Sequence, residues 1–294
     1  MARPAAIDAL ELLKPITWFA PMWAFMCGVV SVSGTIEPAR IPALFVGLLV
    51  AGPLICGTSQ AVNDWFDRHV DAINEPGRPI PSGRIPGRWG LYIAFSWTLL
   101  SLSAAMLLGP IGFAAAAFGM AMAWAYSAPP TRLKRNGWWG NAAVAVCYEG
   151  VPWFTGAAIA AAAMPDWRIV LVAALYSVGA HGIMTLNDFK SVAGDRATGL
   201  RSLPVQLGVD TAARVACWVM VLPQIAVISL LIAWGRPVYA IIITILLAVQ
   251  IILMLRLLGS PRERAAWYNA TGTTLYVLGM LVSAICLRGI GGLS

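Results

Sequence analysis

Charged residues are scarce in this sequence: Asp, Glu, Lys and Arg together make up only 11% of the 294 residues. About a quarter of the residues in an average soluble domain are charged, so this shortage argues against a soluble globular protein. Apolar types make up 59% of the chain, and residues 41–63 and 89–131 contain no charged side chain. Runs of that length and composition are typical of helices that cross a lipid bilayer.

Cysteine and histidine are also rare, and none of the five cysteines belongs to a CxxC pair. All five lie inside apolar segments without a histidine at ligand spacing, which argues against zinc sites and disulfides. The cysteines are Cys27, Cys56, Cys147, Cys217 and Cys286. The chain also lacks a Ser-His-Asp or Cys-His arrangement, so catalysis by a side-chain nucleophile is not indicated.

The apolar segments predict an all-α fold, a polytopic membrane helical bundle of about nine transmembrane helices. The predicted spans are residues 15–34, 41–62, 89–108, 111–128, 139–161, 168–187, 212–233, 238–258 and 267–287. The first span has full membrane length and follows charged residues, so we expect a retained helix and no cleaved signal peptide. We expect residues 1–294 to form a single membrane domain.

Lysine and arginine are distributed unevenly between the predicted loops. Sixteen of the 20 lie in the N-terminal segment, in the loops after the second, fourth, sixth and eighth spans, or at the span ends next to those loops. By the positive-inside rule these segments face the cytoplasm, which puts the N-terminus inside and the C-terminus outside. This asymmetry accounts for the net charge of +7, and no nucleic acid partner is needed to explain it.

Three aspartates follow the second predicted span in the segment NDWFDRHVD, residues 63–71. On a helix, Asp64, Asp67 and Asp71 share one face within an arc of about 60°. Like charges at that spacing repel each other unless a cation binds among them. Oxygen ligands favour a hard metal ion, Mg²⁺ first, and Asn63 is a further candidate ligand.

A second acidic segment, NDFKSVAGD at residues 187–195, follows the sixth predicted span. Asp188 and Asp195 are seven residues apart and would share a helical face. Asn-Asp recurs 124 positions after its first copy, and RPIPSG at 78–83 has a looser counterpart in RSLP at 201–204. This repetition suggests two related halves around a cavity. A single acidic helix end is usually a solvated surface, whereas two copies predict clusters that hold metal ions against a diphosphate.

Basic residues close to both acidic segments are candidates for binding that diphosphate. Arg132 and Lys134 lie in the loop after the fourth span, where they are equally well explained as positive-inside anchors. In the presence of the acidic clusters they become candidate ligands of diphosphate oxygens.

The segments that carry these residues resemble the UbiA superfamily of intramembrane prenyltransferases. The resemblance lies first in NDWFDRHVDAINEPGRPIPSG (63–83), NDFK (187–190) and GDR (194–196). Longer strings are similar to the chlorophyll synthase branch, and more similar to its bacteriochlorophyll synthases. They are KPITWFAPMWAFMCG, AYSAPPTRLKRNGWWG, CYEGVPWFTG, HGIMTLNDFK, RSLPVQLG and WYNATGTTLYVLGM.

The resemblance implies a nine-helix bundle around a membrane-embedded cavity, in the cytoplasmic (inner) or intracytoplasmic membrane of a photosynthetic bacterium. It implies the Mg²⁺-dependent esterification of the C17 propionate of bacteriochlorophyllide a with geranylgeranyl or phytyl diphosphate. The implied metal ligands are Asn63, Asp64, Asp67, Asp71, Asp188 and Asp195, with Asp64, Asp67 and Asp188 central to catalysis. The implied diphosphate ligands are Arg78, Arg132, Lys134, Lys190 and Arg196.

The second motif departs from the family pattern. Many members read D-x-x-D-x-E-G-D, whereas this chain has Ser191 and Ala193 at the two inner acidic positions. Only two carboxylates remain there, so Asp188 is expected to do most of the metal binding in this half.

Three residues inside predicted spans are candidates for contact with the pigment. Glu149 lies near the middle of the fifth span, where a charge is costly, and is either functional or a protonated or Arg-paired structural residue. His181 lies two turns before Asp188 and is either a ligand of the pigment's central magnesium or a packing residue. Trp153 either lines the cavity or packs in the core.

Three other classes of function share some of these features. A transporter would have related halves, but its ionisable groups should lie at the bilayer midplane. A prenyltransferase with a chlorophyllide, quinone or haem acceptor would share the aspartate motifs. A pigment-binding protein without catalytic activity would not need three carboxylates on one helical face.

Overall fold

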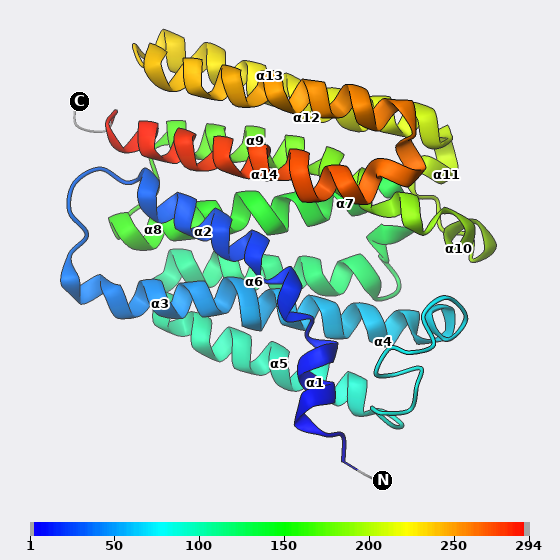
Figure 1. Ribbon diagram of the computed structural model, residues 1–294. Helices are drawn as coiled ribbons and strands as arrows, with labels where there is room; N and C mark the ends of the chain where they lie inside the picture. The colour runs from blue at the N-terminus through cyan, green and yellow to red at the C-terminus, as the bar shows by residue number, and fades with distance from the viewer. Residues whose placement is uncertain (1–2, 291–294) are drawn as a thin grey trace.

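The computed structural model describes residues 3–290, and helices make up nearly all of that range (Figure 1). The α-helices are α1 (Ala6–Leu12), α2 (Phe19–Ser31), α3 (Ile41–Leu49), α4 (Gly57–Asn74), α5 (Trp89–Ala105), α6 (Gly109–Ser127), α7 (Gly137–Ala145), α8 (Val151–Ala161), α9 (Trp167–Asn187), α10 (Val192–Ala197), α11 (Leu203–Leu207), α12 (Val209–Ala233), α13 (Pro237–Gly259) and α14 (Pro261–Arg288). Short 3₁₀ or π turns are η1 (Pro15–Thr17), η2 (Pro38–Arg40), η3 (Val50–Cys56), η4 (Met106–Leu108), η5 (Leu133–Arg135), η6 (Val146–Gly150) and η7 (Asp188–Lys190). The predicted all-α fold is confirmed for these residues.

Two of the long helices contain π turns, and each turn has a proline in it or just after it. Pro53 lies within η3, between α3 and α4, and Pro152 follows η6 at the start of α8. Proline lacks a backbone N–H and its ring presses on the preceding turn, so the regular hydrogen-bond ladder cannot pass through it. Both helices nevertheless continue in nearly the same direction (Figure 1).

The length and hydropathy of the helices make the chain a multi-pass membrane protein. Seven helical segments are long and apolar enough to span a bilayer, or eight if the bent pair Ala6–Thr17 and Phe19–Ser31 is one span. One of the seven, Trp89–Ser127, contains both α5 and α6, which turn at Gly109 with φ of 73° and lie antiparallel (Figure 1). The exact number of nine spans stays a prediction.

The core of the bundle depends on very close helix contacts. A Cβ atom on Gly28 of α2 would lie 2.0 Å from the carbonyl oxygen of Trp153, and one on Gly156 of α8 would lie 2.1 Å from that of Phe25. Small residues that let two backbones touch are a usual basis of helix packing in membranes. Around this contact the buried core includes Trp153 and Tyr176, whose rings stack 5.8 Å apart.

Both aspartate motifs lie at one end of the bundle, which we call the motif end. The last turns of α4 and the segment from the end of α9 through α10 and α11 lie there, while α14 ends at Arg288 at the opposite end (Figure 1). Backbone hydrogen bonds join the loops of the motif end: Gly137 N donates to Arg201 O at 2.8 Å, and Arg201 N donates to Arg135 O at 3.0 Å. The fold therefore joins loops about 65 residues apart, and it brings to one end two motifs that lie 124 residues apart in sequence.

Candidate active site

The two aspartate motifs line a single cavity of about 920 Å³ at the motif end. We call it the acid-lined cavity. Its walls come from α4, the loop after α4, the start of α7 and the segment that follows α9. The motif residues in its lining are Asn63, Asp67, Asp71, Asn187, Asp188 and Asp195.

The carboxylates of Asp64 and Asp71 share one arginine. α4 continues to Asn74, so the predicted helix through the first motif is confirmed. Arg78 Nη1 donates to Asp71 Oδ2 at 2.8 Å and to Asp64 Oδ1 at 3.3 Å. Lys14 Nζ, from the segment before α2, donates to the same Asp64 oxygen at 2.7 Å.

Asp67 is bound by two of the three cations in the loop after α6. Arg132 Nη2 donates to Asp67 Oδ1 at 3.2 Å, and Lys134 Nζ donates to Oδ2 at 2.5 Å. Burial lowers the pKa of Lys134, and the charge of Asp67 acts in the opposite direction. The carboxylates of the first motif are thus neutralised by the protein's own basic side chains.

The spacing of the second motif predicted one continuous helix, and this prediction is wrong. α9 ends at Asn187, a 3₁₀ turn runs from Asp188 to Lys190, and Asp195 lies on the separate helix α10. Asp and Ser are weak helix formers, which favours such a break. Asp188 and Asp195 still line the same cavity, and Asn141 Nδ2 donates to Asp188 Oδ2 at 3.3 Å. Burial raises the pKa of Asp195, and the charge of Asp67 raises it further.

The chemistry of these side chains fits a hard divalent cation. Asp64 is 1% exposed and lies behind the residues that line the cavity, and its Oδ2 atom has no hydrogen-bond partner. Among residues 3–290, no three Asp, Glu, His or Cys side chains converge closely enough to hold a metal ion by themselves. The oxygen donors therefore suit a cation that arrives with further oxygen ligands, as Mg²⁺ bound to a diphosphate does.

The candidate diphosphate ligands differ in their positions. Arg78, Lys134 and Lys190 line the acid-lined cavity, and Arg132 contacts Asp67 at its edge. Arg196 is exposed on α10 and is not part of the lining. Sequence reasoning missed Lys14 and Asn141, which also line the cavity, because nothing in the local sequence connects either of them to an aspartate motif.

The candidate pigment-contacting residues lie outside the acid-lined cavity. Trp153 is fully buried in the core, and its indole N–H donates to Ser31 Oγ at 3.0 Å, so packing explains it. Glu149 lines a separate pocket of about 360 Å³ between α2, η6, α9 and α14. Helical spacing predicted that His181 shares a face of α9 with Asp188. In the structure His181 lines neither the acid-lined cavity nor the pocket of Glu149, but a third region.

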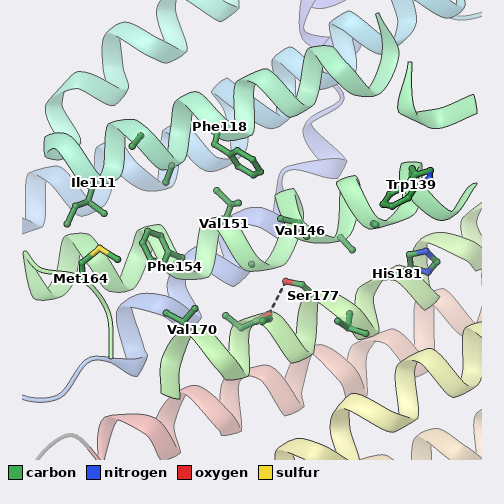
Figure 2. Close-up of a pocket in the computed structure, with 18 of the residues that line it drawn as sticks. Ile111, Phe118, Trp139, Val146, Val151, Phe154, Met164, Val170, Ser177 and His181 are labelled. Carbon is green, nitrogen blue, oxygen red and sulfur yellow. Dashed lines mark hydrogen bonds between the residues drawn. The ribbon is translucent and has the colours of Figure 1, made fainter. Parts of the chain in front are cut away.

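That third region is an apolar groove of about 1150 Å³ between α6, the helix formed by α7 and α8, and α9 (Figure 2). Phe118, Phe154 and Val170 point into it from three sides, and His181 lies at one end near Trp139 (Figure 2). The His181 ring stacks on Trp138 at 5.7 Å. α7 separates the groove from the acid-lined cavity, because its Gly137, Gly140 and Asn141 face the cavity while Trp138, Trp139 and Ala142 face the groove.

The comparisons with known proteins agree with this arrangement. The model of the "UbiA prenyltransferase family" matches residues 18–286. The chain is 60% identical over 281 residues to a protein of Cereibacter sphaeroides described as "Bacteriochlorophyll synthase 33 kDa chain", covering 96% of this chain and 93% of that protein. It is 38% identical over 287 residues to "Chlorophyll synthase, chloroplastic" of Oryza sativa, covering 94% of this chain and 75% of that one.

A similar fold occurs among solved structures. A UbiA homolog from Archaeoglobus fulgidus, bound to DMAPP and Mg²⁺, superposes with a TM-score of 0.71 at 18% sequence identity. The match covers 93% of this chain and 99% of that one. At this identity the likeness establishes the fold.

Proposed function

The chain belongs to the UbiA prenyltransferase family, and we propose that it esterifies the C17 propionate of bacteriochlorophyllide a with a geranylgeranyl or phytyl group from the corresponding diphosphate. It is a prenyltransferase. The observation that supports this reaction best is the meeting of both aspartate motifs and their cations in one cavity. The whole chain would serve as one catalytic domain.

In this proposal the acid-lined cavity binds the diphosphate end of the donor. Mg²⁺, held by Asp64, Asp67, Asp71 and the second motif, would supply positive charge to the leaving diphosphate. Arg78 and Lys134 would move from their carboxylate partners to diphosphate oxygens as the metal takes over the carboxylates. Charged donors fixed in a cavity shielded from water stabilise departing negative charge far better than they do in bulk water.

The reaction then exchanges one C–O bond for another. The bond between the allylic C1 and the diphosphate oxygen breaks, and a propionate oxygen of the acceptor bonds to C1. The diphosphate leaves with the electron pair. An alkyl carboxylic acid is ionised at neutral pH, so the nucleophile arrives charged and needs no base from the protein.

The acceptor is assigned from the relatives. The protein of Cereibacter sphaeroides named above carries "Bacteriochlorophyll synthase" in its name, and the relative of Oryza sativa is called a chlorophyll synthase. The higher identity to the first favours bacteriochlorophyllide a over chlorophyllide a. We also propose that the motif end faces the cytoplasm in the inner or intracytoplasmic membrane of the cell, as the distribution of Lys and Arg suggests.

Ester formation by the purified protein in detergent tests the reaction. Bacteriochlorophyllide a and chlorophyllide a are supplied separately with geranylgeranyl diphosphate, with Mg²⁺ or with EDTA. We expect Mg²⁺-dependent ester from the bacterial pigment. Failure with both pigments, beside an active reference synthase, would contradict the assignment and direct the search to a quinone or haem acceptor.

Two matched variants test the metal site. Asp67→Asn should abolish turnover, because the amide cannot replace a carboxylate ligand. Asp166→Asn is the control: Asp166 caps α9 at the end of the helix opposite the motif end, its Oδ1 accepting from Arg168 N at 2.7 Å, and Asn caps a helix equally well. Equal activity of both variants would contradict the metal assignment.

A further inference from the structure

Three residues that line the small pocket between α2, η6, α9 and α14 each have a buried side-chain oxygen without a hydrogen-bond partner. These atoms are Glu149 Oε2, Asn269 Oδ1 and Thr273 Oγ1. Eight side-chain nitrogen or oxygen atoms among the described residues are buried in this way, and three of them belong to the lining of this one pocket. Leaving such atoms unpaired is costly, so their presence around one pocket points to a polar ligand. We call this site the polar pocket.

The hydrogen-bonding capacity of the polar pocket can be derived from its contacts. Glu149 is 6% exposed, and none of the residues around the pocket is Lys, Arg or His. A carboxylate without a cation at that depth would be costly, so Glu149 is present as the neutral acid, which has an O–H to donate. Thr273 offers a second O–H. Asn269 donates its amide to Asn187 Oδ1 at 2.6 Å, which leaves its oxygen as an acceptor.

Apart from the hydroxyls of Tyr148 and Thr274, which have partners of their own, the walls of the polar pocket are otherwise apolar and aromatic. They include Phe19 and Trp23 of α2 and Val277 and Leu278 of α14. The ligand must therefore have a flat or bulky apolar body with carbonyl oxygens at its edge. A prenyl chain does not fit this description, because it would leave all three oxygens unpaired. A diphosphate does not fit it either, because the pocket has no cation. The volume of about 360 Å³ suits one edge of a macrocycle.

The polar pocket is also close to the acid-lined cavity. Asn187, the partner of Asn269, lines that cavity directly beside Asp188. Tyr148 lines the polar pocket, and its hydroxyl accepts from Nε2 of Gln60, another residue of the cavity, at 3.0 Å. A molecule with one edge in the polar pocket can thus extend a short side chain into the acid-lined cavity.

We propose that the polar pocket binds the acceptor, with Glu149 and Thr273 donating hydrogen bonds to carbonyl substituents on the rim of the tetrapyrrole. This inference rests on the proposed function. Comparing the binding of the two pigments shows which carbonyl group is bound. Both carry the ring ketone, and only bacteriochlorophyllide a carries an acetyl group where chlorophyllide a has a vinyl group.

Two measurements on matched variants test the proposal. They are steady-state kinetics and the Kd of each pigment in the absence of the prenyl donor. Thr273→Val removes one hydroxyl at nearly constant volume and should raise the KM and Kd for the pigment about five- to tenfold, with kcat and the KM for geranylgeranyl diphosphate unchanged. Glu149→Met should act similarly, while Glu149→Gln retains a donor and should stay within about twofold of the wild type. Thr271→Val is the control, because Thr271 donates only to Trp267 O on its own helix.

Each outcome has one meaning. A rise for both pigments identifies the ring ketone, and a rise for bacteriochlorophyllide a alone identifies the acetyl group. If Thr273→Val matches Thr271→Val while the wild type forms ester, the pocket assignment is wrong and the proposed function stands. A rise in the KM for the prenyl diphosphate instead would assign the pocket to the donor. Absence of ester from the wild type would contradict the proposed function itself.

Discussion

Replacement of Arg78 by glutamine should make the protein depend on Mg²⁺ for its stability as well as for its activity. Arg78 holds Asp64 and Asp71 together through one nitrogen, and its side chain is 22% exposed. Glutamine is shorter and neutral, so the two carboxylates would lose their common cation. Lys14 would still bind Asp64, but Asp71 would have no basic partner among the ion pairs of the described residues.

The size of the effect follows from these contacts. A hydrogen bond to a charged group is worth about 1.5–3 kcal/mol, and partial exposure places the pair of bonds at roughly 2–3 kcal/mol in total. For a chain of this size that corresponds to a decrease of about 4–10 °C in Tm without metal. Added Mg²⁺ supplies the missing positive charge, so the difference from wild type should shrink. The missing guanidinium should also lower kcat about 10²- to 10³-fold.

Tryptophan fluorescence during heating measures the Tm in detergent, with EDTA and with Mg²⁺, and ester formation measures kcat. Arg68→Gln is the matched control, since Arg68 lies over the Trp65 ring and donates to the Trp65 carbonyl oxygen, and no acidic side chain is among its partners. The reasoning is refuted if Arg78→Gln and Arg68→Gln have the same Tm in EDTA. It is also refuted if the Tm of Arg78→Gln does not respond to Mg²⁺.

Three further predictions concern other parts of the motif end. Lys14→Met should lower kcat/KM for the prenyl diphosphate about 10- to 100-fold, because buried Asp64 loses its 2.7 Å partner; unchanged kinetics would exclude Lys14 from the site. Arg84 lowers the pKa of Glu11 below its ordinary value of 4.5, so this ion pair stabilises the fold above that pH and is lost as the pH falls below it. The Tm difference between wild type and Arg84→Gln should therefore be present at pH 7 and should shrink as the pH falls below 4.5. Ser191→Asp restores an inner acidic position that lines the cavity, and should lower the Mg²⁺ concentration for half-maximal activity about three- to tenfold; no change would mean that this position does not reach the metal.

The sequence was informative wherever the relevant interaction is local. The aspartates of the first motif share a helical face because three- and four-residue spacing determines it, and α4 has that geometry. The same rule failed for Asp188 and Asp195, because a 3₁₀ turn interrupts the helix between them. The same rule gave a wrong prediction for His181. Spacing along α9 does not reveal that α7 separates the groove, which contains His181, from the acid-lined cavity, which contains Asp188.

Contacts between segments that are distant in the chain could not be predicted from the sequence. Lys14 and Asp64 are 50 residues apart, and an amphipathic pattern cannot report which lysine folds back onto which aspartate. The polar pocket is similar, since Glu149 was conspicuous as a charge inside a span, whereas Thr273 looked like an ordinary helix residue. Only the folded structure brings the two together, as residues that line one pocket between η6, α9 and α14.

The ion pairs of the acid-lined cavity have a consequence for the speed of turnover. In the structure Lys14, Arg78, Arg132 and Lys134 pair with the carboxylates of the first motif. In the proposed reaction, substrate entry would therefore be an exchange of partners, in which these basic side chains leave the carboxylates and bind the diphosphate. After the transfer they would return to the carboxylates, which would weaken the binding of the inorganic product. The same ion pairs would thus act in both substrate binding and product release.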